Sequence, residues 1–156
     1  MATFSEKLKA CGVVGAGGAG FPAYVKAATA VEIVIANGAE CEPLLHKDAE
    51  LMAHYPAQIL DGMRLMMEST GARCGKFGIK EKNAAAVEAI RTSIGEASID
   101  MVFLGDFYPS GDEFELVPAA TGRLIAMQKS QPRDRSWCWS SSFFPATARR
   151  PCRPMS

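Results

Sequence analysis

The sequence predicts an α/β fold, a mostly parallel sheet with flanking helices, and three observations support this fold class. Short β-branched runs alternate with helical patterns along most of the chain, an order typical of parallel sheets. A glycine-rich segment lies near the N-terminus, as in Rossmann-like nucleotide-binding folds. The chain has 156 residues, 48% of them hydrophobic, which is enough for one compact domain with a single core.

The strands are predicted from apolar, β-branched runs bounded by turn residues. They cover residues 31–37, 74–80 and 99–105. Helical periodicity covers residues 44–54, 57–70 and, more briefly, 113–117.

Two of the predicted helices have a clear apolar face. In the segment 57–70, the face that we expect in the core consists of Ile59, Met63, Met66 and Met67. Gly71 is expected to end this helix, and Asn83 is expected to cap the next one. The apolar face of that next helix consists of Val87, Ile90 and Ile94.

The segment 128–156 differs in composition from the rest of the chain. It has six basic side chains against one acid and contains no Gly, Leu, Ile or Val, whereas the whole chain has 17 residues of each charge. Such a segment buries too little apolar surface to offset its ordering entropy, so we expect a disordered tail. The predicted organisation is a domain over 1–127 and an unrelated tail over 128–156, and a frameshift near Met127 is our hypothesis for the break.

Composition also excludes several classes of site and partner. No run approaches the roughly 18 apolar residues of a membrane helix, and the N-terminus lacks a signal peptide. We therefore expect a cytoplasmic protein without direct membrane insertion, either free or peripheral to a membrane complex. The five cysteines form no Cys-x-x-Cys pair, so neither a metal site nor an iron–sulfur cluster is expected. The basic tail has no recognisable nucleic-acid-binding motif, so no nucleic acid partner is expected.

The first candidate site is a glycine-rich loop that precedes Pro22. Its glycines are Gly15, Gly17, Gly18 and Gly20. In a Gly-x-Gly-x-x-Gly loop the backbone approaches a phosphate closely, and the N-terminus of a following helix faces the anion. Pro22 suits the first turn of a helix, and Lys26 is expected in that turn or just beyond it, held by a bound phosphate. The alternative is that Lys26 extends into solvent.

The same loop also fits the NAD-binding domain of a Rossmann dehydrogenase. Glu40 follows at the roughly 20-residue spacing of the ribose-binding acid, which keeps this interpretation open. However, a Rossmann domain has a well-formed strand before the loop and a long helix after it. Only a short segment here separates the loop from the next predicted strand, and an ordinary glycine-rich turn is a further alternative.

The second candidate site follows the strand predicted over 31–37. Asn37 can both donate and accept hydrogen bonds, as the edge of a flavin requires. Glu40 and Glu42 share one face of an extended chain, where they can accept bonds from ribityl or ribose hydroxyls. The alternative is a solvated acidic turn at the start of the next helix.

The third candidate site follows the strand predicted over 99–105. Aromatic residues precede a turn that contains Gly111, Asp112 and Glu113. The turn offers backbone N–H groups and carboxylates next to rings on which a ligand can stack. The alternative is an ordinary turn in which Asp112 caps a helix.

Taken together, these segments resemble one specific family. The order and spacing of residues 15–26, 37–48 and 108–123 resemble the FMN-binding fold shared by the NADH-oxidising flavoprotein of respiratory complex I and by the C subunit of the Rnf electron-transport complex. The resemblance covers about residues 10–126. It is greater to the Rnf branch, which includes cobalamin reductase and the electron-transfer protein associated with proline reductase.

The resemblance implies roles for the residues of all three sites. Gly15, Gly17 and Gly18 match the loop that lies against FMN, Lys26 matches the lysine at the FMN phosphate, and Phe21 matches an aromatic that stacks on the nicotinamide nucleotide. Asn37 and Glu40 match FMN contacts, and Glu42 matches a carboxylate on the nucleotide side. Gly111, Asp112 and Glu113 match the third motif, whose last acid faces the NADH site.

The implied reaction is hydride transfer between NADH and FMN, after which single electrons pass to other electron-transfer subunits. The resemblance assigns no catalytic side chain. Ala16 and Ala39 stand where the complex I branch has an arginine and an aspartate, and Pro118 is expected to break a helix. The family continues beyond Arg123, so we expect a domain that is incomplete at its C-terminal end. A cofactor-free remnant is therefore another alternative.

Overall fold

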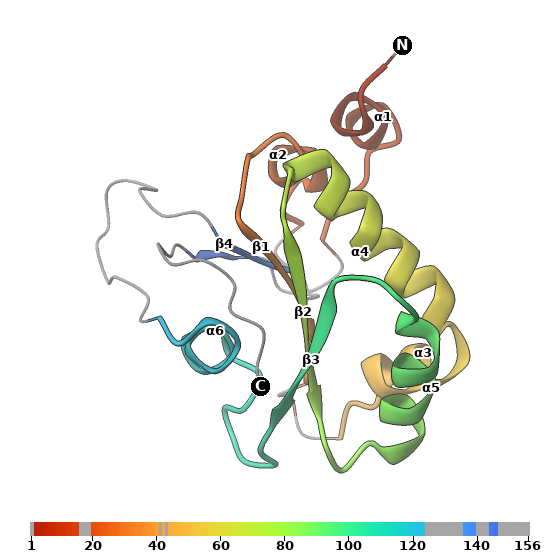
Figure 1. Ribbon diagram of the computed structural model, residues 1–156, viewed down its shortest axis with the longest axis vertical. Coiled ribbons are helices and arrows are strands. Elements are labelled where there is room, and N and C mark those ends of the chain that lie inside the picture. Colours follow the sequence, from red (N-terminus) through yellow and green to blue (C-terminus); the bar gives the residue numbers. More distant parts are fainter. Residues whose placement is uncertain are drawn as a thin grey trace.

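The computed structural model describes residues 2–15, 20–40, 42 and 44–123, and the backbone of 136–139 and 144–146. A sheet with the strand order β3-β2-β1-β4-β5 forms its centre (Figure 1). The three longest strands, β1 (Ile33–Gly38), β2 (Cys74–Lys80) and β3 (Ile99–Leu104), run parallel. The α/β fold class and the three predicted strands are confirmed.

Two short strands extend the sheet beyond β1. β4 (Ser136–Trp139) pairs parallel with β1, and β5 (Phe144–Ala146) pairs antiparallel with β4. Both belong to the segment that we expected to be a disordered tail. The rest of 128–156 lies outside the described residues, so its disorder and the domain boundary stay predictions.

Helices cover both faces of the sheet. The face with α3 (Lys47–His54), α4 (Pro56–Thr70) and α5 (Ala84–Ile94) lies opposite the face with α6 (Glu113–Thr121) (Figure 1). Val34 and Ala36 of β1 pack in the core cluster of α4 and α5, whereas Ile33 and Ile35 pack in the cluster of α6. Because β1 is buried on both faces, its sequence is a continuous apolar run.

The predicted apolar faces of α4 and α5 are confirmed. Met63, Met66, Val87 and Ile90 are buried in one core cluster, and Ile59, Met67 and Ile94 pack against it. Gly71 ends α4 in the left-handed conformation with φ 70°. Asn83 occupies the N-cap position of α5 but makes no capping hydrogen bond through its side chain. The helix predicted from residue 44 begins only at Lys47, since Leu44 has φ 67°.

The N-terminal segment contains two helices that precede the sheet. α1 (Phe4–Ala10) was not predicted, although its capping box is present in the sequence: Thr3 Oγ1 accepts from Glu6 N at 3.2 Å and Glu6 Oε2 accepts from Thr3 N at 2.8 Å. α2 (Ala23–Ala27) follows the glycine-rich loop. Ser69 Oγ donates to the carbonyl of Ala27 at 2.7 Å, so α2 lies beside the end of α4.

The expected break at Pro118 is wrong. α6 continues through Pro118 to Thr121, even though proline removes the hydrogen bond to the carbonyl four residues earlier. The last turn is closed by two other bonds: Gly122 N donates to Pro118 O, and Thr121 Oγ1 donates to Val117 O, both at 2.7 Å. Burial of Leu116 and Val117 adds packing that a single lost bond does not outweigh.

Candidate functional site

The glycine-rich loop is closed at its base by an antiparallel bridge between Val14 and Pro22. Gly15 N donates to Phe21 O at 2.9 Å, and Ala23 N donates to Val13 O at 3.0 Å. Gly20 has φ 60°, a conformation that favours glycine. Gly17 and Gly18 lie outside the described residues. The segment before the loop is not a strand of the parallel sheet, and this geometry differs from that of a Rossmann domain.

Lys26 is a buried residue, with only 1% of its surface exposed. Its Nζ lies 5.2 Å from the centroid of the Phe21 ring, within the range of a cation–π interaction. The predicted place of Lys26, in the first turn of the helix or just beyond it, is confirmed, because Lys26 is the fourth of the five residues of α2. This short helix also ends at the next residue, and a cation is favourable at the C-terminal end of a helix. The alternative of a lysine that extends into solvent is wrong.

Asn37 connects the second candidate site to the third. Its Nδ2 donates to the carbonyl of Gly111 at 2.7 Å, across 74 residues of sequence. Its Oδ1 accepts from Ala39 N at 3.0 Å, which holds the turn after β1. The amide of Asn37 therefore fastens two loops together.

Gly111 makes a close contact that only glycine permits. Its φ is 101°, and a Cβ at this position would lie 2.0 Å from the carbonyl oxygen of Ala39. Gly111 N donates to Glu115 Oε2 at 3.0 Å, so the loop is also held by α6. We call the loop of residues 37–40 and the loop of residues 108–112, joined in this way, the paired loops.

The two acids that follow Gly111 have different surroundings. Asp112 is the N-cap of α6, and its Oδ1 accepts from Phe114 N at 2.7 Å. The alternative interpretation of Asp112 as a helix cap is thus confirmed. Glu113 is partly exposed in the first turn of α6, where the helix dipole favours an acid.

Glu40 is a partly buried acid in the paired loops. Its Oε2 lies 3.9 Å from Lys47 Nζ and has no hydrogen-bond partner among the described residues. Burial, followed by repulsion from the Asp48 carboxylate, raises the pKa of Glu40 above its usual 4.5. Glu42, two residues later, is exposed.

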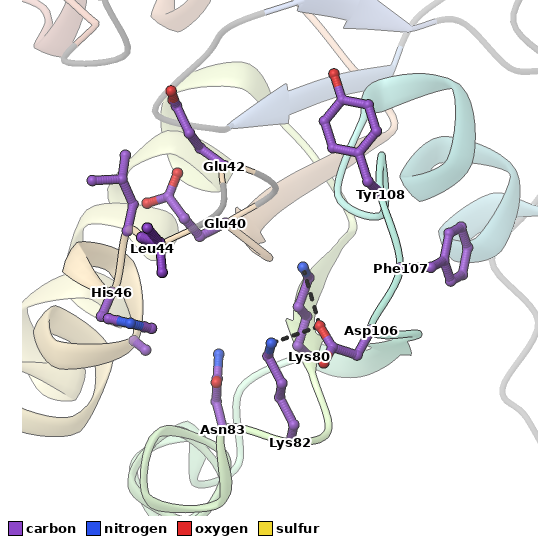
Figure 2. Close-up of a pocket in the computed structure, with 12 residues that line it drawn as sticks. Glu40, Glu42, Leu44, His46, Lys80, Lys82, Asn83, Asp106, Phe107 and Tyr108 are labelled. Atoms are coloured by element: carbon purple, nitrogen blue, oxygen red, sulfur yellow. Dashed lines mark ion pairs between the residues drawn. The ribbon is translucent and has the colours of Figure 1, made fainter.

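A cavity of about 250 Å³ lies beside Glu40 at the carboxyl ends of β1, β2 and β3 (Figure 2). Its polar lining comes from Glu40, Glu42, His46, Lys80, Lys82, Asn83 and Asp106, and its apolar lining from Leu44, Leu45, Ala49, Phe107 and Tyr108. In Figure 2 the amino groups of Lys80 and Lys82 both point to the carboxylate of Asp106. Ligands of α/β proteins usually bind at this edge of the sheet.

Three charged residues of this cavity, Lys80, Lys82 and Asp106, were not predicted from the sequence. The signal was present, since these polar residues lie at or just beyond the carboxyl ends of β2 and β3, as Asn37 and Glu40 do at the end of β1. Lys80 is the last residue of β2, and a lysine inside a strand gave no reason to expect burial.

The predicted site residues therefore form two groups. Asn37, Glu40, Gly111 and Asp112 gather at the carboxyl edge of the sheet, together with the cavity. Phe21 and Lys26 belong to α2 and the loop before it, beside the amino end of β1.

Curated relatives match most of this chain. Cobalamin reductase PduS of Salmonella typhimurium is 46% identical over 121 residues, which are 78% of this chain and 27% of the relative. The C subunit of the Na(+)-translocating ferredoxin:NAD(+) oxidoreductase complex of Acetobacterium woodii is 40% identical, over 73% of this chain and 27% of the relative. The chain thus spans about a quarter of the length of these relatives.

A solved structure with the same fold is the NAD+-reducing [NiFe]-hydrogenase in its H2-reduced state. The match has a TM-score of 0.66 at 22% identity and covers 88% of this chain and 28% of the hydrogenase chain. In addition, the Nuo51 FMN-binding domain matches residues 8–140. The chain belongs to this family, the FMN-binding domain of complex I and of the C subunit of the Rnf complex.

Proposed function

We propose that this domain holds FMN between the glycine-rich loop, Lys26 and the paired loops, and that the flavin accepts electrons from NADH. The observation that carries the proposal is the pair of interlocked loops, which contribute Glu40 and Tyr108 to the lining of a cavity at the carboxyl edge of the sheet. FMN is an elongated ligand with its phosphate at one end and its ring system at the other. It suits a site whose two groups of residues lie along β1.

The chemistry of the paired loops fits a flavin. Ser110 is fully buried, and its hydroxyl has no hydrogen-bond partner among the described residues. Glu40 Oε2 also lacks a hydrogen-bond partner among the described residues, although Lys47 Nζ lies 3.9 Å from it. A buried polar atom without a hydrogen bond destabilises the fold by about 1–3 kcal/mol, so a ligand in the cavity that bonds to Glu40 would relieve this cost there. The N–H groups and hydroxyls of FMN are suitable partners for a carboxylate and a hydroxyl.

We assign Lys26 to the FMN phosphate. Its buried ammonium group faces the Phe21 ring, and a phosphate dianion would add charge-assisted hydrogen bonds in surroundings that contain little water. Gly15 and Gly20 at the base of the loop would let the backbone approach that phosphate. Gly17 and Gly18 keep their predicted role in the same loop.

Bound FMN would accept a hydride and release electrons one at a time. The chain's own residues orient the two ligands: Asn37 and Gly111 fix the paired loops, and Glu42 and Glu113 supply acceptors for the ribose hydroxyls of NADH. Phe21 offers a ring face for the nicotinamide nucleotide. Asp112 positions these groups by capping α6.

Electrons would leave for other electron-transfer subunits. The relatives from Acetobacterium woodii and Pseudomonas aeruginosa are subunits of ion-translocating oxidoreductase complexes. Within the described part of the chain, no helix is long and apolar enough to cross a bilayer. We therefore propose a cytoplasmic domain at the periphery of such a complex, with NADH as donor.

Titration of the purified chain with FMN tests the proposal, with visible flavin absorbance and fluorescence as the readouts. Lys26→Ala should raise the Kd for FMN about tenfold or more, because one charge-assisted contact to the phosphate is lost. Its Kd for riboflavin, which lacks the phosphate, should change much less. Lys9→Ala is the matched control, since Lys9 Nζ also lies over a ring, 5.3 Å from the Tyr24 centroid, but is exposed.

Equal losses for FMN and riboflavin would refute the phosphate role of Lys26. A chain that binds NADH but no flavin would instead support the Rossmann alternative. If neither ligand raises the unfolding temperature, the domain is a cofactor-free remnant, because any ligand that binds only the folded state must stabilise it.

A further inference from the structure

Two lysines of β2 are almost completely buried, and they differ in how well they are neutralised. Lys76 has 8% and Lys80 has 6% of its surface exposed. Lys76 Nζ lies 2.6 Å from Asp100 Oδ2, a short ion pair with a hydrogen bond. Lys80 Nζ lies 3.7 Å from Asp106 Oδ1, and among the described residues this is the ion pair that it makes. The second ammonium group is therefore poorly compensated.

Asp106 is shared between two cations. Its Oδ1 lies 2.6 Å from Lys82 Nζ, much nearer than Lys80 Nζ, and the hydrogen bond from Lys82 lowers the pKa of Asp106. Asp106 is 54% exposed and Lys82 is 53% exposed, so both side chains can rotate away. A buried ammonium group is costly unless close partners compensate its charge, and Lys80 has one long ion pair whose acid it shares with Lys82. The charge of Lys80 is therefore only partly compensated.

All three charges line the cavity at the carboxyl edge of the sheet (Figure 2). A phosphate group, either terminal or within a pyrophosphate, carries negative charge on at least two terminal oxygens, so it can bond to both ammonium groups at once. The Asp106 carboxylate occupies the position that such an anion would take.

The rest of the lining restricts which anion fits. Glu40 and Glu42 stand on another wall of the cavity, as Figure 2 shows, and they would repel a ligand that is anionic throughout. Their oxygens would accept bonds from hydroxyls. Tyr108 is 78% exposed at the rim and offers a ring for stacking. Phosphate, hydroxyls and an aromatic base together describe a nucleotide.

We propose that Lys80 and Lys82 form a phosphate-binding subsite for a nucleotide, and that Asp106 fills this subsite until the nucleotide displaces it. The identification of this nucleotide as the dinucleotide that reduces FMN rests on the proposed function. The phosphate subsite itself does not, since the proposed FMN site uses none of Lys80, Lys82 and Asp106.

Calorimetric titration of the full chain with ADP, adenosine and inorganic phosphate tests the proposal without any flavin. ADP should bind more tightly than either of the other two. Lys80→Met should raise the Kd for ADP about tenfold, because it removes a charge-assisted contact. Asp106→Asn should lower that Kd several-fold, because it removes the competing carboxylate while keeping both lysines.

Lys76→Met and Asp100→Asn are the matched controls, since they change an equally buried lysine and its half-exposed aspartate away from the cavity. They should leave ADP binding unchanged. Equal effects of the Lys76 and Lys80 variants, or an Asp106→Asn variant that binds ADP no more tightly, would overturn the proposal. Inorganic phosphate that binds as tightly as ADP would overturn the nucleotide assignment.

A parallel FMN titration separates this inference from the proposed function. Retained ADP binding in a chain that never binds FMN supports the subsite and contradicts the flavin site. If Lys80→Met does not fold, as judged by circular dichroism, Asp106→Asn still decides the question because the lysine remains in place.

Discussion

The two halves of the candidate site are held in place by different means. The paired loops are fixed by contacts between residues distant in sequence, namely the Asn37–Gly111 hydrogen bond and the close approach of Gly111 to Ala39. In the described part of the glycine-rich loop, the contact that holds it is local, namely the bridge between Val14 and Pro22 at its base. The flavin-ring side of the proposed site therefore belongs to the folded core, whereas the phosphate side is a local hairpin-like element.

The largest effect is expected for Gly111→Ala, which tests the rigid half. A Cβ would lie 2.0 Å from a backbone oxygen, and φ 101° is unfavourable for alanine, so we expect a loss of about 3 kcal/mol or more in the free energy of unfolding. Urea denaturation measures this loss. Gly20→Ala is the matched change in the other half, where no described atom lies within 4 Å of the added Cβ, and it should cost about 1 kcal/mol from backbone strain alone.

Asn37→Ala is expected to come next, with a loss of about 2 kcal/mol, because the carbonyl of Gly111 and the N–H of Ala39 both lose a partner. Thermal unfolding and hydrogen exchange at the paired loops measure it. Asn83→Ala is the control, since the Asn83 side chain makes no capping bond. A similar loss in both variants would mean that Asn37 does not join the loops.

Asp112→Ala should destabilise the protein by about 1 kcal/mol through loss of the N-cap of α6, as measured by urea denaturation. Asp112→Asn keeps an oxygen acceptor and should restore most of the loss. If the asparagine variant is as unstable as the alanine variant, the charge of Asp112 matters more than its capping bond.

The smallest effect is expected for Glu40→Gln, and it depends on pH. The folded state raises the pKa of Glu40, so its contribution to stability is fully present below the usual pKa of 4.5 and is lost as pH rises through the folded value. The glutamine variant should therefore be more stable than wild type near pH 7, and the difference should vanish in acid. Unfolding temperatures across this pH range measure it, with the exposed Glu42→Gln as control.

Local sequence patterns were enough to predict the three longest strands and the two central helices, but not β4 and β5. Apolar runs mark β1, β2 and β3, and the methionine stripe of α4 has helical spacing. The helix boundary at Lys47 and the continuous α6 could not be predicted, because they depend on the left-handed Leu44 and on packing around Pro118. Tertiary contacts override local propensity at these positions.

The sequence pointed to candidate site residues, but it did not predict the contacts between them. The segments after β1 and β3 were each identified as a candidate site at the end of a strand, but the contact between them was not predicted. The hydrogen bond from Asn37 to Gly111 spans 74 residues of sequence, and the spacing of residues in a motif cannot reveal such a contact. Lys80 was missed because its burial depends on packing at the carboxyl edge of β2.

The bridge at the base of the glycine-rich loop reduces the conformational entropy that the loop loses when a ligand binds. With Gly15 N and Phe21 O held 2.9 Å apart, the ends of the loop are already joined before any ligand arrives. The entropy of bringing the two ends together is therefore part of folding and not part of phosphate binding. A substitution that opens this bridge should weaken FMN binding by slowing its capture, even though neither Val14 nor Pro22 needs to touch the ligand.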